Sequence, residues 1–279
     1  MPEHDRTADH QELLRTGVRP ELADDLLAAG LTARVRDRLL VVTEYLDPVD
    51  GESRAFVPLG GEVVLDDPAA LATLVGLAAD RVPAATRLIL LLDSSATPPD
   101  GVPYLRYVRA GTPADAVVPA DGWQLRRTVP ADRADVLPLL RQALAVGYAE
   151  AGSAADGAAL DEVAGAVFTR CLTDGWGFVA HHRGRFTGHL TVLPDQDELT
   201  GECRWELFDL FVLPEFRGGP SARLLTAAAV AAAGDRPLRG HVAGADAHSQ
   251  LVLDRLVGSG WQPDTTYWSI PLPGVRCPA

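Results

Sequence analysis

The chain has 279 residues, a length that favours two domains over one. Its formal net charge of -13 argues against a nucleic-acid partner, because binding to phosphates needs clustered basic residues. The sequence has no apolar run of about eighteen residues and no signal-peptide pattern, so we predict a cytoplasmic protein without a membrane partner.

The N-terminal part of the chain, residues 12–111, is predicted to be a small α/β domain that follows a disordered tail at 1–11. Its clearest strand is 86–93, whose continuous apolar run is typical of a strand covered on both faces. A proline and N-capping aspartates mark the starts of two helices. We expect these helices at 20–30 and 67–80, and further strands at 38–45 and 102–108. No motif in this part indicates a chemical activity.

Residues 112–122 are rich in Pro, Ala and Asp and are predicted to link this domain to a second one at 123–279. The hydrophobic pattern of the second domain predicts the order β-α-α-β-β-β-α-β-α-β. That order is typical of an α+β (mixed α/β) fold, a mixed sheet with helices on its faces. Strands are expected at 124–128, 176–181, 186–193, 204–212, 238–242 and 265–271, and helices from Asp132 and at 158–172, 221–233 and 246–258.

The cysteines and basic residues exclude other kinds of chemistry. Cys171, Cys203 and Cys277 are widely spaced and form no CxxC pair, so we predict reduced thiols and no metal site. All 25 basic residues are arginines. The chain therefore has no lysine to act as a base or to form a Schiff base.

One turn of the second domain carries a pattern suited to binding an anion. A strand ends at Val212, a proline-containing turn follows, and Arg217-Gly218-Gly219 leads into an apolar helix. Consecutive backbone N–H groups at such a turn, together with the positive end of a helix, bind pyrophosphate. The glycines allow the close approach of the ligand to the backbone.

The stretch V-x-P-x-F-R-G-x-x-x-A-x-L-L at 212–225 resembles the acyl-CoA-binding motif of the GCN5-related N-acetyltransferases, the GNAT superfamily. It stands where that family places the motif, between the fourth strand and the third helix. The segment HSQLVLDRLVGSGW at 248–261 resembles the last helix of the family, with its Gly-aromatic end. The resemblance implies a GNAT-like central sheet for 123–279, and we interpret the N-terminal domain as a degenerate GNAT-like domain or a lid.

The resemblance also implies a function. The protein would be an N-acetyltransferase that moves the acetyl group of acetyl-CoA to an amine of a small molecule, by direct attack with general-base assistance. Acyl-CoA would lie between the fourth and fifth strands, and no metal would be needed. The residues expected to bind it are Leu210, Phe211 and Val212 for the pantetheine arm, Arg217, Gly218, Gly219, Ser221 and Ala222 for the pyrophosphate, and Ser249 for the pantetheine.

Glu206 is the candidate base, at a position of the fourth strand where many members of the family carry a glutamate. Asp209 is the second candidate. Strand alternation sends Asp209 to the face opposite Glu206 unless a bulge intervenes, so we do not expect the two carboxylates to work as a pair.

Two departures from the family pattern support an alternative function. Pro220 removes one backbone N–H from the turn, and Leu256 stands where many members have a tyrosine that protonates the leaving thiolate. The alternative is a catalytically degenerate module that binds acyl-CoA or a partner protein. The identity of the acceptor and the formation of a homodimer are left open by the sequence.

Overall fold

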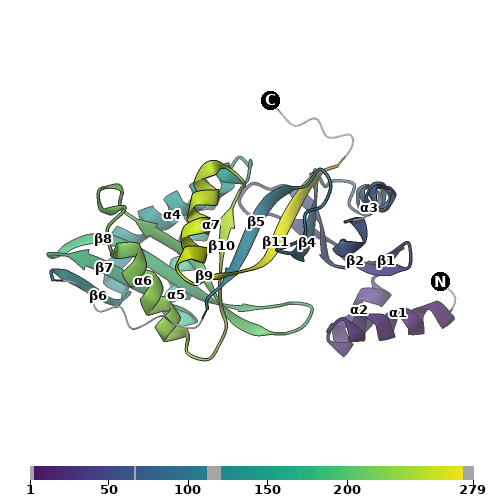
Figure 1. Ribbon diagram of the computed structural model, residues 1–279, viewed down its shortest axis with the longest axis horizontal. Coiled ribbons are helices and arrows are strands. Elements are labelled where there is room, and N and C mark those ends of the chain that lie inside the picture. Colours follow the sequence, from purple (N-terminus) through teal and green to yellow (C-terminus); the bar gives the residue numbers. More distant parts are fainter. Residues whose placement is uncertain (1–2, 66, 112–120, 273–279) are drawn as a thin grey trace. The chain divides into compact units, whose positions relative to one another are not determined.

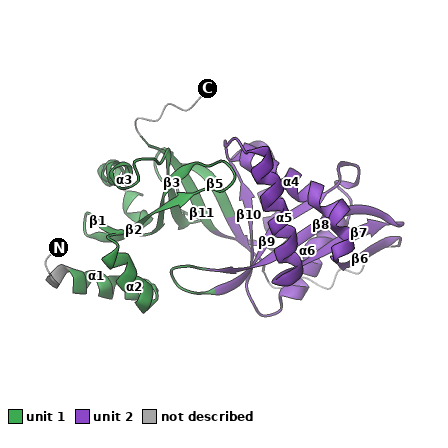
Figure 2. Ribbon diagram, turned by 180° about the vertical axis from the view of Figure 1, so that it is seen from behind, with its two compact units in different colours: residues 1–106, 197–202, 265–279 green, residues 107–196, 203–264 purple. Residues whose placement is uncertain are grey.

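The computed structural model describes residues 3–65, 67–111 and 121–272. Most of the predicted linker, residues 112–120, therefore lies outside the described residues. The chain forms two compact units (Figure 2). Unit 1 comprises residues 1–106, 197–202 and 265–279, and unit 2 comprises residues 107–196 and 203–264. These units differ from the linear division at 112–122, because two strands, Val102–Arg109 (β5) and Gln262–Pro271 (β11), contribute residues to both.

The predicted disordered tail is wrong for the residues that the structure describes, because helix α1 runs from Glu3 to Arg15. Leu13 of this helix is fully buried in a small apolar cluster with the next helix, α2 (Pro20–Ala28). Asp9, which is also buried, accepts a hydrogen bond of 2.9 Å from Nε of Arg34. The low hydrophobicity of the segment hid these few anchoring contacts, which only tertiary packing supplies.

Unit 1 contains a mixed sheet in which the strands follow the order β1-β2-β3-β4-β11. Strands β3 and β4 are parallel, and β11 pairs antiparallel with β4, from Thr265 opposite Asp93 to Pro271 opposite Arg87. Helix α3 (Pro68–Arg81) packs its apolar residues against the sheet, and the carboxylate of the preceding Asp67 caps its first turn. The strand bounds are Thr32–Val35 (β1), Arg38–Leu46 (β2), Ser53–Leu59 (β3) and Arg87–Asp93 (β4).

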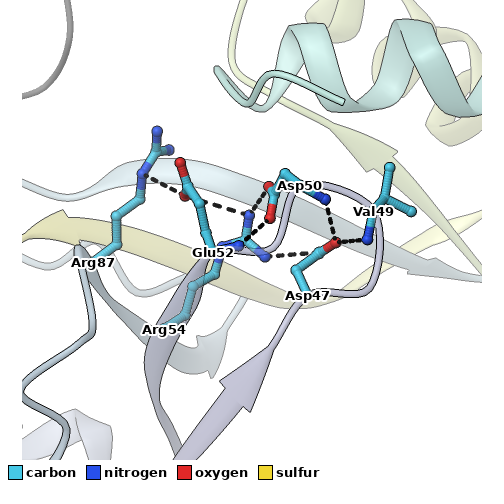
Figure 3. A network of polar contacts seen from close by, with 6 residues as sticks. All are labelled: Asp47, Val49, Asp50, Glu52, Arg54 and Arg87. Atoms are coloured by element: carbon cyan, nitrogen blue, oxygen red, sulfur yellow. Dashed lines mark hydrogen bonds and ion pairs between the residues drawn. The ribbon is translucent and has the colours of Figure 1, made fainter. Parts of the chain in front are cut away.

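A buried arginine fixes the loop between β2 and β3 (Figure 3). Only 1% of the Arg54 side chain is exposed, and its guanidinium bonds to Asp47 at 2.7 Å and also to Asp50. Asp47 in turn accepts the N–H of Val49 at 2.8 Å. A buried charge needs such partners, so this network has a structural role in unit 1.

The strands of unit 2 follow the order β6-β7-β8-β9-β10, where β9 and β10 are parallel and the other neighbours are antiparallel. Leu190 and Val192 of β8 share a core with α6 and α7, and Leu193 lies on the other face with α4 and α5 (Figure 1). The bounds are Trp123–Arg127 (β6), Trp176–His182 (β7), Arg185–Gln196 (β8), Cys203–Val212 (β9), Leu238–Ala243 (β10), Arg133–Glu150 (α4), Gly157–Thr173 (α5), Ser221–Ala233 (α6) and Ala247–Gly258 (α7).

The order of elements along residues 123–271 is the one that the sequence predicted, although the last of them, residues 265–271 of β11, belongs to unit 1. The mixed α/β fold class is confirmed. Short 3-10 turns lie at Gly61–Val64, Pro130–Asp132 and Pro214–Phe216. Across the described ranges, no helix has both the length and the hydropathy that a membrane span requires.

Candidate active site

Strands β9 and β10 separate after a short parallel pairing. β9 pairs with β8 along its length, but its register with β10 covers only Trp205, Glu206 and Leu207. Residues 208–212 therefore have no strand partner on the β10 side within the described chain. An exposed strand edge of this kind accepts an extended ligand through backbone hydrogen bonds. The three residues predicted to bind pantetheine, 210–212, lie in this stretch.

The chain leaves β9 through a tight turn whose residues are mostly exposed. Gly218 has a φ of +81°, a conformation that side chains disfavour, and it is exposed with Arg217 and Gly219. The N–H groups of Arg217 and Gly219 donate within the turn, to the carbonyls of Pro214 and Phe216, both at 3.2 Å. Two of the predicted pyrophosphate donors are therefore engaged in forming the turn.

The remaining donors lie at Gly218 and at the start of α6. Among the residues that the structure describes, none accepts a hydrogen bond from the N–H groups of Gly218, Ser221 or Ala222. Pro220 precedes the helix with a φ of -76°, which suits proline, and its carbonyl accepts the N–H of Leu224 at 2.9 Å. These N–H groups stand at the positive end of the helix dipole, a position that favours an anion.

Side chains around the turn support its backbone. The Ser221 hydroxyl is fully buried and donates to Oγ1 of Thr187 at 3.2 Å, so Ser221 offers a ligand only its backbone. Phe216 lies edge-on to Trp123 and to His182, whose rings stack with centroids 4.6 Å apart. Nε of Arg217 donates to the carbonyl of Val212 at 3.3 Å.

A β-bulge in β9 overturns the expected separation of the two carboxylates. Val192 of β8 pairs with Leu207, but its neighbour Thr191 pairs with Asp209, so β9 contains one extra residue. Glu206 pairs with Leu193, which shares a face with Thr191. Glu206 and Asp209 therefore project from the same face of the sheet, the face covered by α4 and α5.

Only Glu206 is accessible as a base. Asp209 is buried, and its Oδ2 lies 2.6 Å from Nε2 of the buried His189. The Glu206 side chain is 21% exposed, and its Oε1 lies 3.2 Å from Nδ1 of His241 on β10. Burial favours a higher pKa for Glu206, but the hydrogen bond with His241 and the positive charges of His241 and Arg239 outweigh it, so the pKa lies below its ordinary value.

His241, which sequence reasoning did not single out, lies beside the candidate base Glu206. In the parallel register, Arg239 of β10 lies opposite Glu206 of β9, and His241 stands two residues further along β10. Residues two apart share a face of the sheet. The register of a parallel pair cannot be read from the sequence of the two strands alone, so this juxtaposition needed the structure.

The segment 248–261, which resembles the last helix of the GNAT family, forms α7 and the turn after it. Asp246 caps α7 by accepting the N–H of Ser249 at 2.7 Å, and only 1% of Ser249 is exposed, so its contact with pantetheine stays a prediction. Gly260 has a φ of +96°, and Trp261 donates to the carbonyl of Leu256 at 3.1 Å before entering the core. The Gly-aromatic pair thus ends the helix. The described part of the chain contains no cluster of three His, Cys, Asp or Glu side chains that could hold a metal ion.

No protein-family model and no curated protein matches the sequence. Similar solved structures include a GCN5-related N-acetyltransferase from Sphaerobacter thermophilus, with 14% identity over 86% of this chain and 78% of that chain and a TM-score of 0.49. A functionally unknown conserved protein from Staphylococcus epidermidis ATCC 12228 has 14% identity over 86% of this chain and 93% of its own, with a TM-score of 0.50. A tandem GNAT protein from the clavulanic acid biosynthesis pathway has 17% identity over 99% of this chain and 97% of its own, with a TM-score of 0.46.

At 14% identity, the Staphylococcus epidermidis structure, with its TM-score of 0.50, shows a likeness of fold alone. The structure itself has three features that the sequence resemblance implies: the order of elements along residues 123–271, the separation of β9 from β10, and the glycine turn into α6. The chain therefore has a mixed α/β fold in two units, with the order of elements that the resemblance to the GNAT superfamily implies.

Proposed function

We propose that the protein is an acyl-CoA-dependent N-acyltransferase that acetylates an amine of a small molecule. The observation that carries this proposal is the open edge of β9, which runs directly into a turn with free N–H groups and begins beside an ionised carboxylate at Glu206. An extended arm that ends in a pyrophosphate matches the first two features. The carboxylate suits the transfer of a group to an amine.

The residues present fit acetyl-CoA, which when bound supplies the acetyl group as a reactive thioester. The backbone of Leu210 to Val212 would hold the pantetheine arm by strand-like hydrogen bonds. The N–H groups of Gly218, Ser221 and Ala222 would hold the pyrophosphate. Solvent-exposed Arg217 and Gly219 leave room around this turn for the ligand.

In this proposal, the carboxylate of Glu206 provides the general-base assistance. Its lowered pKa keeps the carboxylate ionised at neutral pH, so it can accept hydrogen bonds from an incoming amine and attract its cationic form. The formal charge of -13 favours a cationic acceptor through long-range attraction. Both features support an amine as the acceptor class.

A second candidate is an acyl-CoA-binding module without turnover. It is favoured by the reduced donor set of the turn, in which Pro220 has no N–H and those of Arg217 and Gly219 are engaged internally. Leu256 in place of a tyrosine also favours it. The two candidates differ in one measurable property, the release of free CoA in the presence of an amine.

The test compares acetyl-CoA binding by the wild type and by Ala222→Glu. A carboxylate in the first turn of α6 stabilises the helix through its dipole but repels a pyrophosphate, so the variant should lose binding at least tenfold without a lower melting temperature. Ala72→Glu, on an exposed position of α3 in unit 1, is the matched control and should bind normally.

Calorimetric titration is followed by an assay of free-thiol release with a panel of amines. Binding with amine-dependent release supports the transferase, and binding without release supports the module. The absence of saturable acetyl-CoA binding by the wild type would refute both candidates.

A further inference from the structure

The geometry points to a carboxylate–imidazole dyad in which His241 takes the proton of the acceptor amine and Glu206 positions the imidazole. This inference rests on the proposed function and refines the role of Glu206 in it. Oε1 of Glu206 lies 3.2 Å from Nδ1 of His241, across the point where β9 and β10 begin to separate. The dyad therefore stands at the inner end of the open strand edge.

The hydrogen bond selects one form of the imidazole. A carboxylate beside Nδ1 favours the tautomer with the proton on Nδ1, which leaves a lone pair on Nε2. An ionised carboxylate is a good hydrogen-bond acceptor, but a lowered pKa makes it a weak proton acceptor at neutral pH. The lone pair on Nε2 of a neutral imidazole is the better acceptor for the proton of an amine.

The surroundings of His241 leave it accessible and flanked by defined groups. Its side chain is 24% exposed. Glu206 faces it from β9, and the Tyr107 ring faces it from β5 with the ring centroids 5.4 Å apart. On its own strand, the guanidinium of Arg239 lies over the Tyr107 ring at 4.3 Å, and its Nε pairs with Asp264 at 2.7 Å.

His241 both accepts and returns the proton that moves during the transfer. As the amine nitrogen bonds to the acyl carbon and the carbon–sulfur bond breaks, the amine proton passes to Nε2 of His241. The imidazolium then returns a proton to the departing sulfur. The same residue thus acts first as base and then as acid. It would donate the proton that a tyrosine supplies in many GNAT members, where this chain has Leu256.

The first test reads the tautomer of His241 in the free protein by ¹⁵N NMR, with the signal assigned by its loss in His241→Gln. The wild type is expected to hold the proton on Nδ1 above the imidazole pKa. Glu206→Ala should shift the population toward the Nε2-protonated form that unrestrained imidazole prefers. A wild-type imidazole protonated mainly on Nε2 would overturn the dyad, whatever the activity.

The second test separates chemistry from binding. His241→Gln should lower kcat by about 10²- to 10⁴-fold with the KM for acetyl-CoA unchanged, and it should abolish the loss of activity toward acidic pH. Added imidazole should restore part of the activity of His241→Gly. His181→Gln, which removes an imidazole from β7 of the same unit, is the control and should keep the wild-type rate.

The outcomes distinguish this inference from the proposed function. If the wild type shows amine-dependent thiol release and His241→Gln keeps both its kcat and its pH profile, the dyad is wrong and the transferase stands. If the wild type shows no such release with any amine, the transferase fails and the catalytic role of His241 fails with it.

Discussion

Nε2 of His189 lies 2.6 Å from Oδ2 of Asp209, with only 1% and 6% of the two side chains exposed. Removing one side of this buried contact leaves a polar group without its partner, so Asp209→Ala should lower the free energy of unfolding by about 1–3 kcal/mol. Urea denaturation followed by circular dichroism measures this change.

Asp254→Ala is the control for this prediction. Asp254 is exposed and accepts one hydrogen bond from Gln250 within α7, so its loss should change stability by about 0.5 kcal/mol or less. Equal urea midpoints for Asp209→Ala and the wild type would contradict a stabilising role for this pair.

The start of α4 should give unit 2 a pH-dependent stability. Asp132 accepts two hydrogen bonds from Arg126, at 2.6 and 2.7 Å, and one from Val129 at 2.8 Å. The hydrogen bonds from Arg126 are the largest cause of a lowered pKa for Asp132, ahead of the opposing effect of burial. A lowered folded-state pKa adds stability that is present above the unfolded-state pKa, about 3.9, and is lost as the pH falls through the folded-state value.

Asp132→Asn should therefore be less stable than the wild type by about 1–3 kcal/mol near pH 7, because hydrogen bonds to a charged group are lost. The difference should shrink as the pH falls below about 4, where the wild-type carboxyl is also protonated. Urea titrations across this pH range measure it. Asp161→Asn, which removes an exposed ion pair with Arg141, serves as the control. A stability difference between Asp132→Asn and the wild type that stays constant with pH would contradict the lowered pKa of Asp132.

Pro220→Gly should bind acetyl-CoA several-fold more tightly than the wild type. The substitution adds a backbone N–H at the start of α6, where the neighbouring donors are free. It should also lower the free energy of unfolding by about 0.4–1 kcal/mol, because glycine gives the unfolded chain more freedom. Calorimetry and thermal melts report the two effects separately.

Pro130→Gly controls for this variant, because Pro130 starts the turn that precedes α4 and lies away from the donor groups. It should reduce stability by a similar amount and leave acetyl-CoA binding as it is. Unchanged affinity in Pro220→Gly would mean that the missing N–H does not face the pyrophosphate.

The described cysteines should differ sharply in reactivity. Burial raises the pKa of Cys171 to about 11, whereas Cys203 is exposed. Because the thiolate is the reactive form, iodoacetamide at pH 8 should label Cys203 at least roughly a hundredfold faster than Cys171. Mass spectrometry of the peptides measures the two rates. In guanidinium the two rates should converge, and similar rates in the native protein would contradict the burial of Cys171.

The sequence was informative wherever structure is local. Periodicity located the helices of unit 2 because each buries one apolar stripe, and the predicted helix 221–233 coincides with α6. The glycine turn was recognisable because a left-handed backbone at Gly218 restricts the residue type. The predicted helix at 246–258 likewise begins at the capping residue Asp246.

The features that the sequence did not reveal depend on contacts between distant segments. The bulge in β9 arises from the register with β8, and the pairing of Glu206 with His241 depends on the register with β10. A single extra residue in a strand reverses the face of every later side chain. For that reason the placement of Asp209 could be stated only as conditional on a bulge.

The strand β11 has a consequence for how the protein is made. Its residues Thr265 to Pro271 complete the sheet of unit 1 beside β4, although the whole of unit 2 separates the two strands in the sequence. During synthesis on the ribosome, the edge of β4 that pairs with β11 stays unpaired until almost all of the described chain has emerged. Expression of residues 1–111 alone should therefore yield an aggregation-prone fragment, and the addition of a peptide spanning 262–272 should restore its solubility.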